Sequence, residues 1–214
     1  MSEIITPPML DEVIRDSAKL EGCVTADECA KHEKKYRELL EIVDDDGNVL
    51  GSAPRGLAHR IGLRHTVVYC VVRNSSGDKW LLQTRGSGRL DISVGGHVQA
   101  DESSYSDALA REFSEELGLT PEVGKFQSVA VYHRDAELRP DRPLVRNRER
   151  RHVFAYNMTE DEEKSLLAQF KEREEQEAVL GFSWFTVKEV EEAVQAGKCA
   201  DGLASSMPHL LENC

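Results

Sequence analysis

Hydrophobic and polar residues alternate along the chain in segments that predict strands separated by turns. The run Thr66–Val72 is rich in β-branched residues and has the length of a buried strand. The turn-forming residues Asn74–Asp78 follow it, so Lys79–Arg85 is expected to be the returning strand of a hairpin. Residues Glu41–Leu50 are expected to form another hairpin, because Asp46-Gly47 supplies a tight turn.

Further strands are predicted later in the chain. Phe126–Tyr132 and His152–Tyr156 are expected to pair, and Val179–Phe185 is the last run with strand character. The hydrophobic content of 40% is enough to build a proper core. Strands that alternate with helical segments place the chain in the α/β class.

Helical patterns occur at the N-terminus and after the paired strands. Thr25 with Glu28 forms a capping-box pattern for a helix that ends near residue 40, and an apolar stripe precedes it. Thr159–Lys171 begins with glutamates, which suit a helix N-terminus, and Thr186 with Glu189 caps a further helix. These patterns divide the chain into an N-terminal helical extension, one domain and a tail without a predicted element, over residues 1–40, 41–196 and 197–214.

Charge and composition exclude several classes of function. The net charge of −12 and a pI near 5.1 argue against binding of a nucleic-acid polymer, which requires a basic surface. No apolar run approaches the ~18 residues of a membrane span, and the N-terminal residues lack a signal-peptide pattern. The cysteines are odd in number and scattered, which predicts free thiols in a cytoplasmic protein. A zinc site from Cys23, Cys29 and His32 is disfavoured, because no fourth ligand is evident nearby.

One helix is expected to carry three carboxylates on one side. At about 100° per residue, Glu115 and Glu116 lie to either side of Glu112. Like charges this close weaken a helix, and a divalent cation with oxygen ligands would compensate them. A solvated acidic face is the simpler interpretation, but Phe113 and Leu117 form an apolar arc beside the carboxylates. Two glycines lie just upstream, where main-chain carbonyls could reach the same ion. We therefore favour a metal site.

This stretch resembles the Nudix box, the signature of the Nudix hydrolases. Gly96 and Glu102 have the spacing of the first half, and Arg111–Leu119 matches the second half apart from Phe113 at an aliphatic position. The segment between the two halves is one residue longer than the pattern. Because Ser104 with Asp107 resembles a capping box, we place the extra residue before the helix.

The resemblance implies a Nudix-type α/β/α sandwich with a mixed sheet, and a small-molecule diphosphate substrate. It implies Mg2+, or Mn2+, held by Glu112, Glu115, Glu116 and the carbonyl of Gly96. Either Glu112 or Glu177 would take a proton from water, and Arg111 would orient Glu115. The expected substrate contacts are Arg85, His97, Arg148 and Arg151, the last two from an arginine-rich segment. That segment is equally well explained as a flexible loop facing an acidic surface, and His97, His59 and His65 as structural histidines.

A finer resemblance links residues 41–195 to the Nudix subgroup related to isopentenyl-diphosphate isomerase. It rests on Ala53-Pro54-Arg55, on Leu81–Arg85 and on Asp91–Ser103. Three functions follow: a magnesium-dependent pyrophosphohydrolase, an isomerase of isopentenyl diphosphate, and a non-catalytic ligand sensor. The isomerase chemistry of that subgroup uses a cysteine where this chain has Ile92–His97, without a thiol, and a sensor tends to lose box carboxylates that this chain keeps. The hydrolase is therefore favoured, with a homodimer through the N-terminal segment as an expected assembly.

Overall fold

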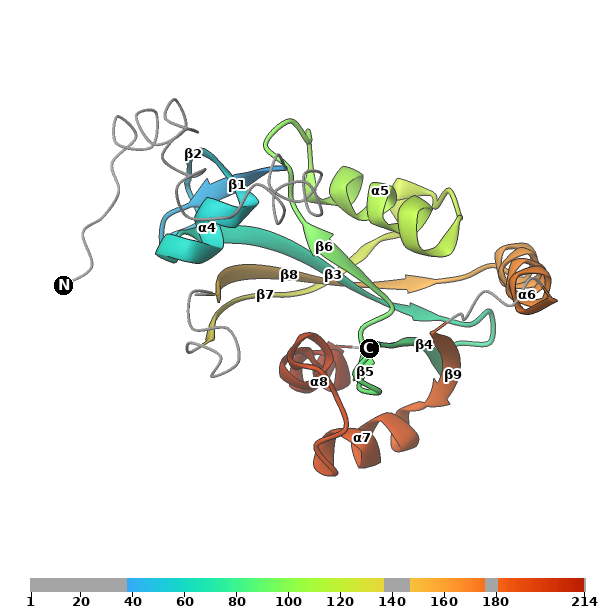
Figure 1. Ribbon diagram of the computed structural model, residues 1–214. Coiled ribbons are helices and arrows are strands. Elements are labelled where there is room, and N and C mark those ends of the chain that lie inside the picture. The colour runs from blue at the N-terminus through green and yellow to red at the C-terminus, as the bar shows by residue number, and fades with distance from the viewer. Residues whose placement is uncertain (1–37, 137–146, 176–180, 214) are drawn as a thin grey trace. The chain divides into compact units, whose positions relative to one another are not determined.

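The computed structural model describes residues 38–136, 147–175 and 181–213. Its strands are β1 (Leu39–Val43), β2 (Val49–Pro54), β3 (Arg64–Arg73), β4 (Lys79–Thr84), β5 (Leu90–Asp91), β6 (Val94–His97), β7 (Gln127–Ala136), β8 (Asn147–Asn157) and β9 (Phe182–Thr186). Its helices are α4 (Arg55–Ile61), α5 (Tyr105–Leu117), the 3-10 helix η1 (Val123–Lys125), α6 (Glu160–Glu175), α7 (Val187–Gln195) and α8 (Asp201–Asn213). Figure 1 follows the chain from β1 to α8. The predicted N-terminal helices, Cys23, Cys29 and Glu177 lie outside the described residues.

Strand pairing follows the order β2-β1-β3-β4-β5. In addition, β6 and β8 pair with β3, β7 pairs with β8, and β9 pairs with β4. The chain divides into two compact units, and β3, β6, β7 and β8 contribute residues to both. The described residues of unit 1 are 38–67, 97–103, 132–136 and 147–151, and those of unit 2 are 68–96, 104–131, 152–175 and 181–213.

Unit 1 contains the first predicted hairpin. β1 and β2 pair antiparallel with Leu40 opposite Ala53, and Gly47 takes the positive φ of 87° that the turn requires. The side chain of Asp44 closes the turn by accepting hydrogen bonds from the main-chain N–H groups of Asp46 and Asn48, at 2.9 and 2.8 Å. The prediction of an Asp-Gly turn is thus confirmed.

The short helix α4, also in unit 1, was not predicted from the sequence. It follows Pro54, and Gly62 ends it in the left-handed conformation with φ 72°, its N–H bonded to the carbonyl of Ala58. The segment is polar and short, so hydrophobic periodicity does not reveal it. Because α4 forms, His59 lies on a helix.

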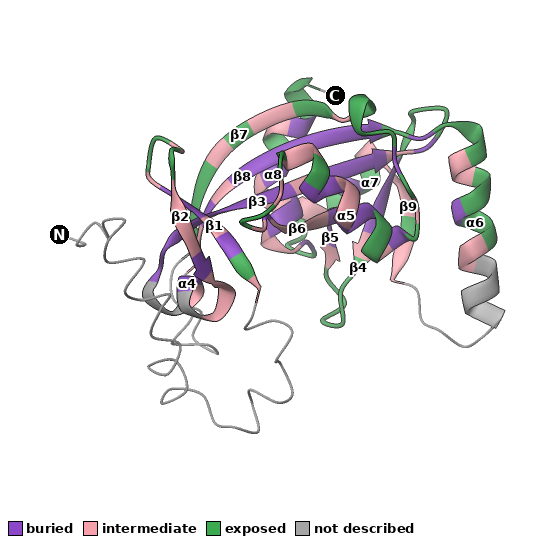
Figure 2. Ribbon diagram, turned by 90° about the horizontal axis from the view of Figure 1, so that it is seen from above, coloured by how far each residue is buried: buried purple, intermediate pink, exposed green. Residues whose placement is uncertain are grey.

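Unit 2 is built around an apolar side of α5. Leu109, Phe113 and Leu117 are fully buried, and the ring of Phe113 contacts the rings of Phe126 and Tyr156 with centroids 5.3 and 5.2 Å apart. Figure 2 shows the buried residues of α5 beside exposed ones on the same helix. This packing fixes the rotation of α5, and so decides where its three glutamates point.

The C-terminal segments complete unit 2. β9 pairs antiparallel with β4 from Lys79–Thr186 to Gln83–Phe182, and the Thr186–Glu189 capping box starts α7 as predicted. The tail, for which no element was predicted, forms α8 with Leu203, Met207 and Leu210 buried. No helix among the described residues is long and apolar enough to cross a membrane.

Candidate active site

The N-terminus of α5 lies where the Ser104 capping pattern predicts it. Ser104 is the N-cap, and its hydroxyl oxygen accepts a hydrogen bond from the N–H of Asp107 at 3.1 Å. The helix therefore begins at Tyr105, which agrees with the prediction that the extra residue precedes it. In unit 1, the Glu102 carboxylate accepts a hydrogen bond from the N–H of Gln99 at 2.7 Å, closing its own loop.

Gly96 and Glu112 approach each other more closely than any side chain at position 96 would permit. A Cβ on Gly96 would lie 1.8 Å from Glu112 Oε1, and one on Gly95 would lie 2.3 Å from the ring of Tyr69. Glu112 is only 8% exposed although its side chain ends in a carboxyl group. The two glycines therefore let the β6 backbone come against a buried carboxylate.

Arg111 contacts the carboxylates of its own helix. Its Nη1 donates to Glu112 Oε1 at 2.7 Å and lies 3.6 Å from Glu115 Oε1. The sequence predicted that Arg111 orients Glu115, whereas the shorter contact is to Glu112. Glu115 has a side chain that is 56% exposed, so it is the outermost of the three acids.

Glu116 of unit 2 carries a carboxyl group whose pKa is strongly shifted. Burial is the largest cause and the nearby charge of Glu112 is the next, and together they raise the pKa of Glu116 to about 8. A backbone hydrogen bond of Gly95 and the charge of Arg85 oppose this rise. Burial of a second carboxylate beside Glu112 is costly without a cation, so the two acids suit a divalent ion.

Arg85 and Asp91 form an ion pair whose charges reach Glu116. The Nε of Arg85 donates to Asp91 Oδ2, and the two side chains are 57% and 2% exposed. Both charges act on Glu116, Arg85 lowering its pKa and Asp91 raising it. The structure thus brings Arg85 into electrostatic reach of the box acids. Asp91 was not among the predicted site residues, because a single aspartate in a short strand carries no sequence signal.

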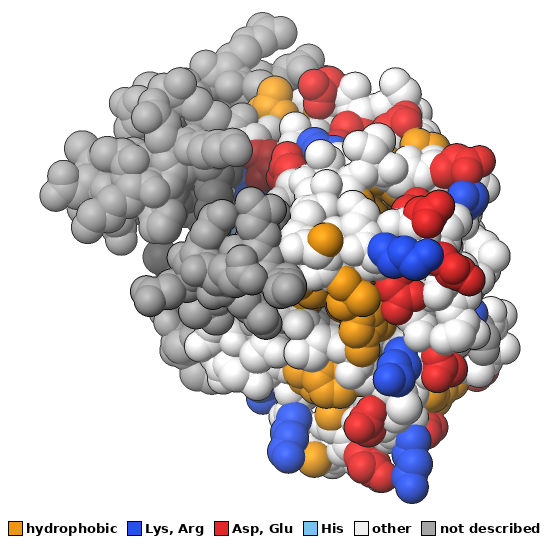
Figure 3. Space-filling model, turned by 90° about the vertical axis from the view of Figure 1, so that its right-hand side faces the viewer, with side chains coloured by type: hydrophobic (Ala, Val, Ile, Leu, Met, Phe, Trp, Pro, Cys, Tyr) orange, Lys and Arg blue, Asp and Glu red, His pale blue; other side chains and the backbone are white. Residues whose placement is uncertain are grey.

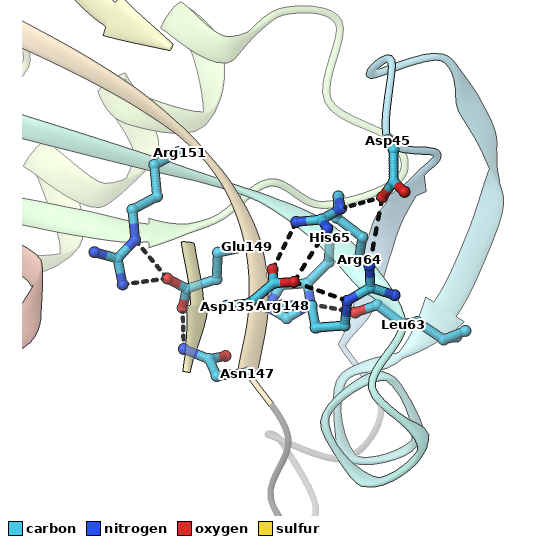
Figure 4. Close-up of polar contacts among 9 residues, drawn as sticks. All are labelled: Asp45, Leu63, Arg64, His65, Asp135, Asn147, Arg148, Glu149 and Arg151. Atoms are coloured by element: carbon cyan, nitrogen blue, oxygen red, sulfur yellow. Dashed lines mark hydrogen bonds and ion pairs between the residues drawn. The ribbon is translucent and has the colours of Figure 1, made fainter. Parts of the chain in front are cut away.

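The two predicted substrate contacts from the arginine-rich segment, Arg148 and Arg151, lie in unit 1 and have other partners. Arg148 forms ion pairs with Asp45 and Asp135, at 3.4 and 3.3 Å (Figure 4). Arg151 is 2% exposed, and its Nε donates to Glu149 at 2.7 Å. These contacts do not favour phosphate binding by Arg148 or Arg151.

Three histidines meet in unit 1. The ligand atoms of His59 from α4, His65 from β3 and His97 at the end of β6 all lie within 4.8 Å of one another. His59 Nε2 and His97 Nε2 are 3.1 Å apart. The three side chains belong to different elements, and their convergence was missed because spacing along the chain does not reveal it.

The tautomer of His65 follows from its surroundings. Its Nδ1 lies 3.0 Å from the carbonyl oxygen of Leu63, which only accepts, so Nδ1 carries the proton (Figure 4). Its Nε2 is buried and has no hydrogen-bond partner among the described residues. Burial also lowers the pKa of His65 to about 4, so the ring is neutral at pH 7. A neutral imidazole with one nitrogen held by a carbonyl is the form that binds metal ions.

Comparison with known proteins gives the family. The model of the NUDIX domain matches residues 63–205. The chain belongs to the Nudix family. It is 41% identical over 88 residues to the uncharacterized Nudix hydrolase all7351 of Nostoc sp. strain PCC 7120, covering 38% of this chain and 52% of that protein. It is 39% identical over 88 residues to the uncharacterized Nudix hydrolase YfcD of Escherichia coli K12, covering 38% and 48%.

The Nudix fold is also seen in a solved structure. The crystal structure of DR0079 from Deinococcus radiodurans matches with a TM-score of 0.55 and 23% identity, over 80% of this chain and 97% of that one. The predicted Nudix-type α/β/α sandwich with a mixed sheet is thus confirmed. The chain spans about half the length of the curated relatives it matches. These comparisons support the Nudix family and not the finer isomerase-like subgroup.

Proposed function

We propose that this Nudix protein is a magnesium-dependent hydrolase of a diphosphate bond in a nucleoside diphosphate derivative or a related organic diphosphate. The observation that carries the proposal is a pair of acids beside the Gly95-Gly96 backbone, of which Glu112 is buried and Glu116 is half-buried. The relatives named Nudix hydrolases support the reaction class.

The donor atoms fit Mg2+ or Mn2+. Both ions prefer hard oxygen ligands, which Glu112, Glu115 and Glu116 would supply together with the carbonyl of Gly96. A cation here would also offset the burial and the repulsion from Glu112 that together raise the pKa of Glu116. When bound, such an ion neutralises diphosphate charge and lowers the pKa of water.

The chain's own side chains would then divide the remaining tasks. Glu112 is the candidate to accept a proton from water, because it is buried and held by Arg111 at 2.7 Å. Arg85 would bind a phosphate group, since a guanidinium suits phosphate geometry. Glu177 stays a predicted alternative base and His97 a predicted substrate contact.

A panel of nucleoside and isoprenoid diphosphates tests the proposal. With Mg2+ we expect one member to be hydrolysed, and Glu116→Gln to reduce kcat by at least about 100-fold, because the amide is a poor metal ligand. Folding should be preserved, since the raised pKa means that Glu116 is largely neutral at pH 7 without metal. Glu160→Gln is the matched control, because that side chain is 79% exposed on α6.

The other outcomes of the panel identify the alternatives. Binding of a diphosphate without any magnesium-dependent cleavage would replace the hydrolase by a ligand sensor. Conversion of isopentenyl diphosphate to its allylic isomer would establish the isomerase, although Cys70 and Cys199, the cysteines among the described residues, are both buried. A cytoplasmic location and a homodimer stay predictions, the latter testable by light scattering.

A further inference from the structure

Asp91 is a buried carboxylate that joins three segments of unit 2. It is 1% exposed. Its Oδ1 accepts hydrogen bonds from the N–H of Ile92 at 2.9 Å and from the N–H of Leu203 at 3.1 Å. Its Oδ2 accepts from Nε of Arg85. Every oxygen of this carboxylate is therefore used, and Arg85 is the only charged group among the described residues that pairs with it.

Arg85 is held at one end and open at the other. Its backbone forms a tight turn, with Arg85 N–H bonded to Arg89 O at 2.9 Å and Gly88 N–H bonded to Arg85 O at 2.8 Å. Among the described residues, Asp91 is the one acid that pairs with Arg85, the two terminal guanidinium nitrogens make no hydrogen bond, and the side chain is 57% exposed. A guanidinium fixed through Nε still presents two parallel N–H groups, the arrangement that binds phosphate oxygens.

The C-terminal helix fixes the other side of Asp91. Leu203 lies in the first turn of α8, and the preceding residues bond to β5 through Leu90 N–H to Lys198 O at 3.0 Å and Ala200 N–H to Leu90 O at 2.7 Å. A Cβ on Gly202 would lie 2.7 Å from Asp91 Oδ1. The helix start therefore approaches the carboxylate as closely as glycine permits.

We propose that Asp91 is a positioning residue for phosphate recognition, which aims the terminal nitrogens of Arg85 at the diphosphate and is itself locked by the first turn of α8. This role rests on the proposed hydrolase function. It assigns the helix at the end of the described chain a part in substrate binding, although α8 contributes no group to the reaction.

The isosteric change Asp91→Asn isolates the pair. An asparagine Oδ1 can still accept from Ile92 and Leu203, whereas its amide group cannot accept from Arg85. We expect Asp91→Asn to raise KM about tenfold with kcat changed less than about threefold, as loss of one charged phosphate contact would. Arg85→Ala should raise KM at least as much, and the double variant should be no worse than Arg85→Ala alone. The controls are Arg89→Ala, in the same exposed turn, and Asp161→Asn, which is 97% exposed.

Two results would overturn the role. One is an unchanged KM in Asp91→Asn, and the other is a double variant whose loss is the product of the single losses, which would make Asp91 a purely structural anchor of α8. If Asp91→Asn fails to fold, the KM of Arg85→Lys tests the same role with Asp91 intact. Lysine lacks the Nε–H and the two-nitrogen fork, so KM should again rise about tenfold, and an unchanged KM would reject the role.

Binding of inorganic pyrophosphate, measured by calorimetry with Mg2+ and with EDTA, separates this inference from the proposed function. If no organic diphosphate is hydrolysed but pyrophosphate binds wild type about tenfold more tightly than Asp91→Asn, the hydrolase fails and the positioning role stands. If hydrolysis occurs and both KM and pyrophosphate affinity ignore the substitution, the hydrolase stands and the positioning role fails.

Discussion

Glu116 illustrates how one residue can link stability to metal binding. Its ordinary pKa of 4.5 rises to about 8 in the folded chain, first because of burial and then because of Glu112. Between these two pH values the folded state holds a proton that the unfolded state has released. The favourable contribution of this group is therefore complete below about pH 4.5 and is lost as the pH rises to about 8.

We expect the melting temperature of the metal-free protein to carry this signature. In EDTA, the excess stability of Glu116→Gln over wild type should grow between pH 5 and pH 8.5, because only wild type must ionise a buried acid, and should reach roughly 1–3 kcal/mol. Addition of Mg2+ should reverse the order by stabilising wild type alone. Thermal unfolding followed by circular dichroism measures both effects. A difference that does not vary with pH would show that Glu116 is ionised throughout.

At the scale of elements, the contact between β6 and α5 determines how the carboxylates and the main chain of the candidate site face each other. The buried arc of α5 fixes the direction of its glutamates, and glycine in β6 lets the strand approach them. Neither element would form the site alone, because the carboxylates need the backbone opposite them.

Gly96→Ala tests this contact. Since the added Cβ would lie 1.8 Å from Glu112 Oε1, either the strand or the carboxylate must move. We expect a stability loss of about 1–3 kcal/mol and at least about a tenfold fall in kcat. Gly124→Ala, at a position where a Cβ meets nothing within 4 Å, is the control in urea unfolding and in the hydrolase assay. Equal behaviour of the two variants would rule out a tight β6–α5 contact.

At the scale of the whole molecule, each compact unit holds a different ligand set. Unit 2 carries the carboxylates of α5, which suit Mg2+ or Mn2+, and unit 1 carries three imidazoles, which suit Zn2+ and similar ions. The surface charges are not separated in this way. Figure 3 shows acidic and basic side chains interspersed on the described part of one face, in a chain of net charge −12.

We therefore expect two metal responses that are lost separately. Zn2+ should raise the melting temperature of wild type and of Glu116→Gln but not of His97→Ala, because the latter lacks one of the three ligands. Mg2+ should raise the melting temperature of wild type and of His97→Ala but not of Glu116→Gln. His133→Ala is the control, since His133 is exposed and is not one of the three clustered histidines. A Zn2+ shift that survives in His97→Ala would place the ion elsewhere.

The sequence by itself determined the parts of this protein that depend on neighbouring residues. The Asp44–Asn48 turn, the Ser104 cap and the Thr186–Glu189 capping box involve groups at most four residues apart, so their signals are readable in order. The box helix and its acidic side followed from a repeat of 3.6 residues per turn. The family resemblance was carried by the same local motif.

Only the tertiary structure decided which distant groups meet. Asp91 and Leu203 are 112 residues apart, and the three histidines come from a helix and two strands. The burial of Arg151 could not be recognised either, because it depends on the elements that pack around β8 and not on neighbouring residues. Side-chain partners at long sequence separation are chosen by packing of whole elements, and burial then sets their charge. Periodicity and spacing carry neither kind of information.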